Sequence, residues 1–494
     1  MTADEAGWLD LPPARMRELG HQVVDLVVDH LTGLRTQPVR TQATPDELRH
    51  VLDEPVPDQP TDAGTLVDFI AHEVMSRSLR LGHPGCLAFI PSSNNFLSVL
   101  GDLLASGFNN SPGAWPVGAG PAAVELVTAR WLATLLGLPE GAGGVFTPGG
   151  TLANLTALAA ARDDRLGYDA TGGVLYCSEQ THPAVLRACH VIGLRRDQVR
   201  TLPTLNADTA RSEIQADRAT GLRPFLVLAT AGTTGTGLIE PLPELVALCR
   251  EESLWLHVDG AHGAAAALTE RGRRALRGLS EADSVVIDPH KWLFQPYEIG
   301  CVLVRDPEVL RRSFTIDGFR GQAGYLAVSR PSNAETNLSD RGVQFTTAAR
   351  ALKLWLSLKG FGVEAFRAAI DHGLDQAEYV AGRVTDHPEL ELVAGPSLGI
   401  VCLRHHRGAD DLQAAICREI NESGHTFLAT TTVEGALALR LCTINPRTTR
   451  ADLDQVLTTI ADTGRSLAGE VGPSDTTPAS VSSHSVDHDG QVGG

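Results

Sequence analysis

Short runs of nearly continuous apolar residues recur through the middle of the chain, each four or five residues long. They occupy Val174–Cys177, Phe225–Ala229, Trp255–Val258, Ser284–Ile287 and Cys301–Val304. Strands that are apolar at successive positions are typical of sheets with helices on both faces. Helical spacing marks Leu126–Leu138 and Thr151–Arg162. The alternation between about residues 120 and 305 therefore predicts an α/β unit.

The chain opens with a segment of helical periodicity, which an extended connector follows. The apolar residues at helical spacing are Leu19, Val23, Leu26, Val27 and Leu31. Pro55, Pro57 and Pro60 come next, and this density of proline favours an extended arm over packed core. The segment either wraps around a partner subunit or packs on its own chain.

After the α/β region the pattern changes to a long helix over about 348–385, and then to a smaller α+β unit. That unit contains strands at Gly399–Leu403 and Ala436–Leu441 and helices at Asp411–Glu422 and Ala451–Ala461. Beyond Ser466 the composition predicts a disordered tail. We therefore expect an N-terminal segment at 1–90, a large domain at 91–372, a small domain at 373–465 and a tail at 466–494.

Composition narrows the classes of partner. The chain carries 41 Lys and Arg against 59 Asp and Glu, a formal net charge of −18, so we expect no nucleic-acid partner. Long apolar runs are lacking, and the acidic start has neither the basic nor the apolar part of a secretory signal. We expect no membrane span and a cytoplasmic location. The eight cysteines form no CxxC pair, so we expect small buried residues.

Lys291 is the first candidate for chemistry. It lies in Asp288-Pro-His-Lys-Trp292, directly after an apolar strand, where α/β sheets place ligands. A lone loop lysine is ordinarily a solvated charge, but another strand ends in His257-Val-Asp259. A carboxylate paired with a pyridine nitrogen keeps that nitrogen protonated, so the ring accepts electrons when a bond at a substrate Cα breaks. Taken alone, Asp259 is equally compatible with a helix N-cap.

Three further segments are suited to a phosphate or a ring. Gly150 and Thr151 stand at a helix start, where backbone N–H groups and the helix dipole favour an anion. Thr234 follows the strand Phe225–Ala229 and adds a hydroxyl. His182 follows another strand and could lie on a cofactor ring, where it would hold or pass a proton. Taken singly, each is also compatible with a plain cap or a structural histidine.

Together and in order, these segments resemble the group II pyridoxal 5′-phosphate (PLP)-dependent amino-acid decarboxylases, which include aromatic-L-amino-acid, histidine and glutamate enzymes. The resemblance covers roughly residues 15–462. The matching stretches are His83–Pro91, Phe146–Thr151, Gln180–His182, Gly232–Thr234, His257–Asp259, Asp288–Leu293, Arg350–Trp355 and Leu439–Asn445. Each stretch is weak alone, but the ordered set is specific.

The resemblance implies PLP fold type I: an α/β large domain with a mostly parallel seven-stranded sheet, a small C-terminal α+β domain, and an N-terminal segment exchanged across a homodimer. It implies that Lys291 holds PLP as a Schiff base, that Asp259 pairs with the pyridine nitrogen, and that His182 stacks on the ring. The residues implied around the phosphate are Gly150, Thr151, Thr234, Asp288 and His290, and those on the substrate side are Phe89, Ile90 and Ser92. The implied reaction is decarboxylation of a small L-amino acid to an amine and CO₂. Phe89 and Ile90 are apolar and favour an aromatic substrate.

One departure from the family concerns the proton that Cα must receive. The family usually carries a loop tyrosine for this step, and counting back from Trp355 places Leu338 there. Leucine has no proton to donate, which leaves Tyr325 or His182 as donors. Family members without the tyrosine can consume oxygen and release an aldehyde. We favour the amine as the product and keep the aldehyde as the alternative.

Other classes of function match parts of the sequence. Gly118-Ala-Gly-Pro-Ala-Ala123 fits the GxGxxA pattern of nucleotide-binding oxidoreductases, but no convincing strand precedes it. A catalytically inactive PLP-fold binding protein is a second alternative, against which the intact set of Lys291, Asp259 and His182 argues. The histidines form no spaced ligand set, so we expect no metal.

Overall fold

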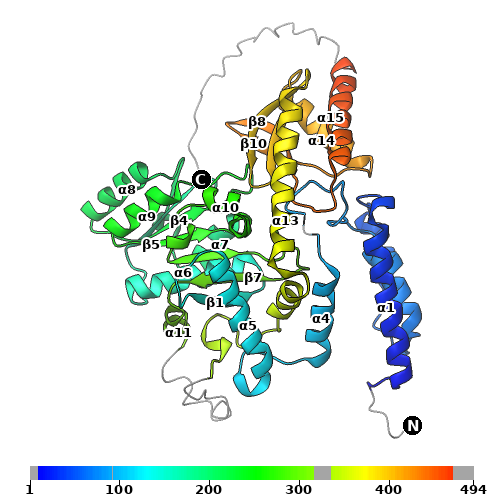
Figure 1. Cartoon of the computed structure of the whole chain (residues 1–494), viewed down its shortest axis with the longest axis horizontal. Helices are drawn as coiled ribbons and strands as arrows, with labels where there is room; N and C mark the ends of the chain where they lie inside the picture. Colours follow the sequence, from blue (N-terminus) through cyan, green and yellow to red (C-terminus); the bar gives the residue numbers. More distant parts are fainter. Residues whose placement is uncertain (1–8, 92, 316–334, 471–494) are drawn as a thin grey trace, which may run out of the picture.

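The computed structural model describes residues 9–91, 93–315 and 335–470. At its centre is a seven-stranded sheet in the order β1-β7-β6-β5-β4-β2-β3 (Figure 1). The strands are β1 (Gly143–Thr147), β2 (Gly173–Ser178), β3 (Val199–Leu202), β4 (Arg223–Thr230), β5 (Trp255–Asp259), β6 (Ser284–Ile287) and β7 (Gly300–Val304). β7 runs antiparallel to both neighbours and the other adjacent pairs are parallel. The prediction of a mostly parallel seven-stranded sheet is confirmed.

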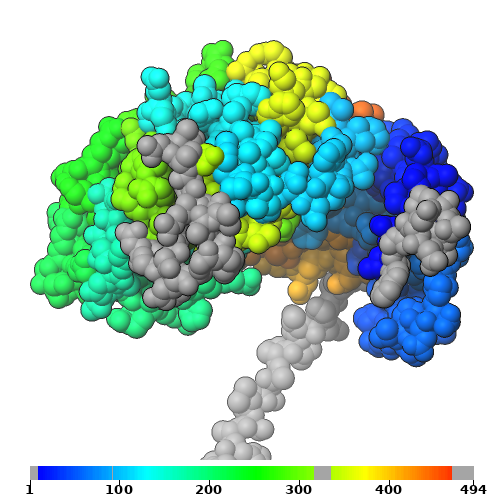
Figure 2. All heavy atoms as spheres, turned by 90° about the horizontal axis from the view of Figure 1, so that it is seen from below, coloured from blue at the N-terminus to red at the C-terminus, as the bar shows by residue number. Residues whose placement is uncertain are grey.

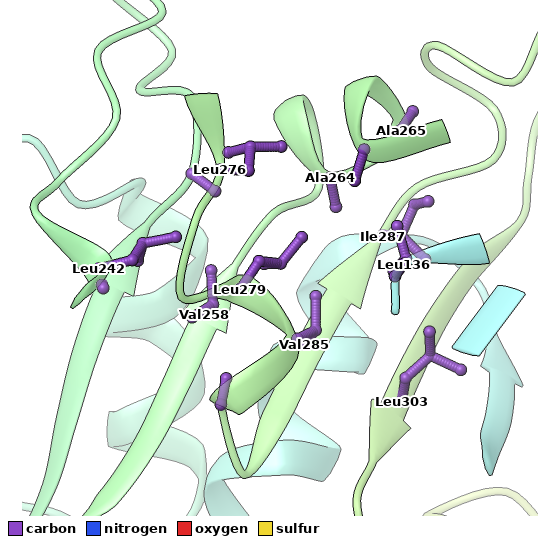
Figure 3. Packing of buried hydrophobic residues seen from close by; sticks show 14 of the residues in the cluster. Leu136, Leu242, Val258, Ala264, Ala265, Leu276, Leu279, Val285, Ile287 and Leu303 are labelled. Atoms are coloured by element: carbon purple, nitrogen blue, oxygen red, sulfur yellow. The ribbon is translucent and has the colours of Figure 1, made fainter. Parts of the chain in front are cut away.

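Helices cover both faces of this sheet, which explains why its strands are apolar at successive positions. They are α5 (Trp115–Leu135), α6 (Gly150–Leu166), α7 (Pro183–Val191), α8 (Ala207–Ala219), α9 (Leu242–Glu251), α10 (Glu270–Ala275) and α11 (Glu308–Phe314). Along β6, Val285 and Ile287 belong to one core cluster and Val286 to the other, as strand alternation requires. Figure 3 shows the first cluster, to which Val258 of β5 and Leu303 of β7 also belong.

Two strands of this sheet were not predicted, and one of its covering helices is longer than expected. The sequence does not predict β1, which begins with two glycines, because glycine has low strand propensity; a Cβ on Gly144 would lie 1.8 Å from the carbonyl oxygen of Val302. It also does not predict the edge strand β3, which is only partly apolar. α5 begins at Trp115, well before Leu126, and contains non-helical backbone at Gly118. The GxGxxA segment therefore lies inside a helix and lacks the strand that would precede a nucleotide-binding turn.

α13 (Ala351–Thr385) connects this sheet with a second, four-stranded antiparallel sheet in the order β10-β11-β9-β8 (Figure 1). The elements of this part are β8 (Leu390–Ser397), β9 (Ile400–His405), α14 (Asp410–Glu422), β10 (Ala429–Val433), β11 (Ala436–Cys442) and α15 (Arg450–Glu470). α13 crosses the domain boundary expected at 372/373, since it packs against α5 and also against β8. α15 extends beyond Ser466, where we expected the tail to begin, because Leu467 packs on the core of this second unit.

The N-terminal helices are α1 (Pro13–Gly33), α2 (Pro45–Leu52), α3 (Ala63–Phe69), the π-helix η2 (Ile70–Met75) and α4 (Phe96–Phe108). Short 3₁₀ turns are η1 (Leu34–Thr36), η3 (Arg196–Gln198), η4 (Gly263–Leu268), η5 (Leu279–Glu281) and η7 (Leu338–Asp340). The predicted opening helix is present as α1, but α1, α2 and α3 contain no buried residue. Figures 1 and 2 show α1 at one side of the molecule, away from the large sheet. Within the described ranges, every helix is too short or too polar to cross a membrane.

Candidate active site

A cavity of about 410 Å³ lies at the carboxyl ends of the parallel strands. All residues predicted to hold the cofactor line it: Gly150, Thr151, His182, Thr234, Asp259, Asp288, His290 and Lys291. They follow β1, β2, β4 and β6 or end β5. Because β2, β4, β5 and β6 are parallel, their carboxyl ends meet at one edge, where α/β sheets bind ligands.

Lys291 is paired with a carboxylate. Its Nζ lies 3.1 Å from Asp288 Oδ2, and the lysine side chain is 27% exposed. Burial alone would lower the pKa of Lys291, but the carboxylates of Asp288 and Asp259 more than offset burial, so the pKa is raised. The free amine is therefore charged near neutral pH.

Asp288, His290 and Gly150 pack closely beside this pair. The Nε2 of His290 lies 3.6 Å from Asp288 Oδ2, and burial lowers the pKa of His290 despite that carboxylate. A Cβ on Gly150 would lie 2.7 Å from the same oxygen, so a side chain there would collide with Asp288. Gly149 has a φ of 88°, which favours glycine. The start of α6 thus presents backbone N–H groups to the cavity without a side chain in front of them.

Asp259 is buried at the end of β5, with both carboxylate oxygens partly satisfied by the protein. Oδ1 accepts the backbone N–H of Ala261 at 3.1 Å, and Oδ2 accepts the side-chain amide of Asn154 at 3.2 Å. These two hydrogen bonds restrict the rotation of the carboxylate. The remaining lone pairs are available to a cation in the cavity.

His182 is held at the start of α7 by the backbone. Its Nδ1 accepts the N–H of Ala184 at 3.2 Å, so the neutral ring carries its hydrogen on Nε2. Burial and then the charge of Lys291 lower the pKa of His182, despite opposing carboxylates. A neutral ring at the cavity can lie on a flat ligand and exchange a proton at Nε2.

Asn154, His262 and Tyr297 also line the cavity, although the sequence analysis did not single them out. Asn154 lies one helical turn after Gly150, and this spacing is the signal that could have identified it. His262 donates from Nε2 to the carbonyl of Leu398 at 2.9 Å. The ring of Tyr297 lies 4.9 Å from that of His290, a contact that no local pattern marks.

Three buried polar atoms beside the cavity have no partner among the described residues: Thr230 Oγ1, His262 Nδ1 and Asp288 Oδ1. Buried polar atoms without partners are rare, so their concentration at one cavity indicates a polar ligand. PLP fits the residues present, because Lys291 can bind its aldehyde, Asp259 its ring nitrogen, and the start of α6 its phosphate.

The residues predicted for the substrate side differ in their position from the predicted cofactor residues, which all line the cavity. Phe89 and Ile90 do not line the cavity of their own chain, because a bridge between Cys86 and Phe427 holds this segment against the small unit. The Phe89 side chain is 59% exposed. Ser92, also predicted for this side, lies outside the described residues.

Arg440 joins this segment to the cavity and was not singled out by the sequence. Its Nη1 donates to the carbonyl of Phe89 at 2.6 Å, and its Nε donates to the carbonyl of Thr234 at 2.9 Å. A buried guanidinium thus fixes the position of Phe89 relative to the loop that carries Thr234.

Leu338 lies in η7 with 2% of its surface exposed. It faces a small space that Val145, Phe146 and Leu152 also line, so it packs as an apolar core residue beside the start of α6. Tyr325, an alternative proton donor, lies outside the described residues.

Comparisons with known proteins agree with this geometry. The family model described as the pyridoxal-dependent decarboxylase conserved domain matches residues 45–406. An aromatic-L-amino-acid decarboxylase of Bacillus atrophaeus is 40% identical, over 94% of this chain and 97% of that protein. A phenylacetaldehyde synthase of Petunia hybrida is 27% identical, over 90% of this chain and 93% of that protein. Among solved structures, Oryza sativa TDC with PLP and tryptamine has a TM-score of 0.88 and 26% identity, over 94% of this chain and 100% of that chain.

Proposed function

This chain belongs to the pyridoxal-dependent decarboxylases, and from that premise we propose that it removes the carboxylate of an aromatic L-amino acid, with Lys291 as the cofactor-linked residue. Family membership establishes a PLP-dependent carboxy-lyase acting on an amino acid. The observation that carries the residue assignment is the single cavity in which Lys291, Asp288 and Asp259 meet.

The cavity residues would have three roles: they would anchor the cofactor, keep its ring nitrogen charged and transfer a proton. PLP, when bound, supplies an aldehyde that links to amines and a ring that accepts the electron pair left when CO₂ departs. Asp259 would hold the ring nitrogen charged, and the start of α6 would bind the phosphate. Lys291 would anchor the cofactor through its side-chain amine. His182 orients the ring and carries an exchangeable proton at Nε2.

The aromatic substrate is supported by two observations. The Bacillus relative, 40% identical over nearly the whole chain, is an aromatic-L-amino-acid decarboxylase. Phe89 and Ile90 supply the apolar surface that such a side chain needs, and Arg440 fixes the backbone of Phe89 near the Thr234 loop.

We propose that the enzyme is a homodimer in which Phe89 faces the partner's cavity. Phe89 is exposed and does not line its own cavity. Large apolar side chains are also exposed on α4, among them Leu103, Leu104 and Phe108, the last at 74%. α1, α2 and α3 bury no residue within one chain. Exposed apolar surface of this extent is typical of an interface between subunits.

The lysine assignment has a direct test, because the chain contains only three lysines: Lys291, Lys353 and Lys359. Borohydride reduction of the PLP-loaded enzyme should fix the cofactor to the peptide that contains Lys291. Lys291→Ala should lower CO₂ release from aromatic amino acids by about three orders of magnitude or more. Lys359→Ala, which changes an exposed lysine, is the matched control and should leave the rate unchanged. Turnover by Lys291→Ala at the wild-type rate would refute the proposal.

Leu338 favours a second candidate product, the aldehyde, because a buried leucine cannot protonate the substrate carbon. The two products are separated by one assay. Incubation with aromatic L-amino acids, in air and without oxygen, should yield equal amounts of amine and CO₂ and no hydrogen peroxide. Aldehyde and peroxide that form only in air would establish the oxidative route instead.

A further inference from the structure

A chain of buried polar side chains lies behind Asp259. Trp255, His257 and Asp259 occupy alternate positions of β5 and therefore share one face of the sheet. Ser284 of β6 is the register partner of His257, and α6 places Asn154 against the same face. All of these side chains are buried.

The direction of every hydrogen bond in this chain follows from its two ends. An indole N–H can only donate, so Trp255 Nε1 donates to Ser284 Oγ at 2.8 Å. A carboxylate can only accept, so the Asn154 amide nitrogen donates to Asp259 at 3.2 Å. The oxygen of the Asn154 amide must then accept from His257 Nε2 at 2.8 Å.

The tautomer of His257 is fixed by these neighbours. Burial lowers the pKa of His257 to about 4, so the ring is neutral and carries one hydrogen, on Nε2. Its Nδ1 is then an acceptor for the Ser284 hydroxyl at 2.8 Å. The bonds run in one direction, from Trp255 through Ser284, His257 and Asn154 to Asp259.

This arrangement points to a role beyond packing. The inference drawn from it rests on the proposed function of Asp259. We infer that Asn154 and His257 are positioning residues that hold the carboxylate of Asp259 toward the cofactor ring nitrogen. Rotation of the Asn154 amide would place its oxygen against a carboxylate and its NH₂ group against a histidine N–H. Both contacts are repulsive, so the histidine holds the amide in the orientation that donates to Asp259. A fixed donor to one oxygen and the Ala261 N–H on the other leave the carboxylate little freedom to turn.

The first test compares Asn154→Leu with Thr156→Val. Both change a buried polar residue of α6, but the side chain of Thr156 donates to the carbonyl of Leu152 in its own helix and, within the part of the chain that the structure describes, to no residue of β5 or β6. PLP binding is measured by titrating the apoprotein, and the absorption of bound PLP is followed against pH. Asn154→Leu should raise the PLP dissociation constant about tenfold or more and shift the absorption midpoint, because a hydrogen bond to an ionised group is lost. Thr156→Val should move neither quantity. Lower thermal stability with both quantities unchanged in Asn154→Leu would overturn the inference.

A second pair of variants applies whether or not Asn154→Leu folds. His257→Gln keeps a side-chain N–H that can reach the Asn154 oxygen, whereas His257→Leu removes it. PLP affinity and the absorption midpoint should stay close to wild type in His257→Gln and change in His257→Leu. If the two variants behave alike, the inference about Asn154 and His257 is wrong, but the proposed function stands. Wild-type protein that binds no PLP would overturn the proposed function and this inference together.

Discussion

Glu125→Gln should make the enzyme more stable than wild type at alkaline pH, by a margin that grows as the pH rises toward about 8 and is constant above it. Glu125 is buried on α5, and its Oε1 has no partner among the described residues. Burial raises the pKa of Glu125 to about 8, although the backbone N–H groups of Ala351 and Arg350 at the start of α13 oppose this. A buried, protonated glutamic acid therefore joins α5 to the helix that leads into the small unit.

The sign and size of the effect follow from linkage. The pKa in the folded protein is about 8 against an ordinary value of 4.5, so the folded state holds the proton more tightly. Its stabilising contribution is complete below pH 4.5 and is lost as the pH rises through about 8. Above that pH the loss amounts to about 5 kcal/mol of unfolding free energy, an order-of-magnitude figure. Glutamine has no proton to lose, so it contributes no such pH dependence.

The assay is urea unfolding of the PLP-loaded protein at one concentration and at pH 5.5, 7 and 8.5. Wild type should lose stability relative to Glu125→Gln across this range, with the larger part of the change between pH 5.5 and 7, because the difference levels off as the pH passes the folded-state pKa of about 8. Glu140→Gln, at an exposed position, is the matched control and should follow wild type. Parallel curves for wild type and Glu125→Gln would show that Glu125 does not hold its proton in the folded state.

Three further changes test the cavity and the core. Gly150→Ala should weaken PLP binding about tenfold or more, since its Cβ would lie 2.7 Å from Asp288 Oδ2; an unchanged dissociation constant in apoprotein titration would contradict this. Phe225→Ala, in the buried part of β4, should cost about 3–5 kcal/mol of unfolding free energy, and a loss under about 1 kcal/mol in urea unfolding would show loose packing. Arg440→Lys cannot reproduce the bonds to Phe89 and the Thr234 loop, so KM should rise several-fold in steady-state kinetics with little change in kcat; an unchanged KM would separate Arg440 from substrate binding.

Much of the fold could be predicted because the strands that build the site are continuously apolar, and apolar runs are visible without tertiary information. β1 could not be predicted, because it begins with glycines. Gly144 lies so close to β7 that no side chain fits there, and this contact exists only in the assembled sheet. The meeting of Lys291 and Asp259 at one cavity could be predicted, since Asp259 ends β5 and Lys291 follows β6. His262 could not, because its place depends on a contact with Leu398 of the small unit. The polar chain behind Asp259 depends on the β5–β6 register, which no local pattern encodes.

The raised pKa of Lys291 sets a requirement on how the site begins to work. A charged ammonium has no lone pair, so the amine must lose a proton before its nitrogen can bond to an aldehyde carbon. Asp288 raises the lysine pKa, because its Oδ2 lies 3.1 Å from the lysine nitrogen and stabilises the charged form. His290 adds no competing charge, because burial lowers its pKa. We therefore expect Asp288 to pair with the charged lysine before the cofactor is bound, while Asp259, fixed by the Asn154 amide and the Ala261 N–H, stays available to the ring nitrogen. On this proposal the two carboxylates of one cavity take different roles because their partners differ: Lys291 for Asp288, and the Asn154 amide with the Ala261 N–H for Asp259.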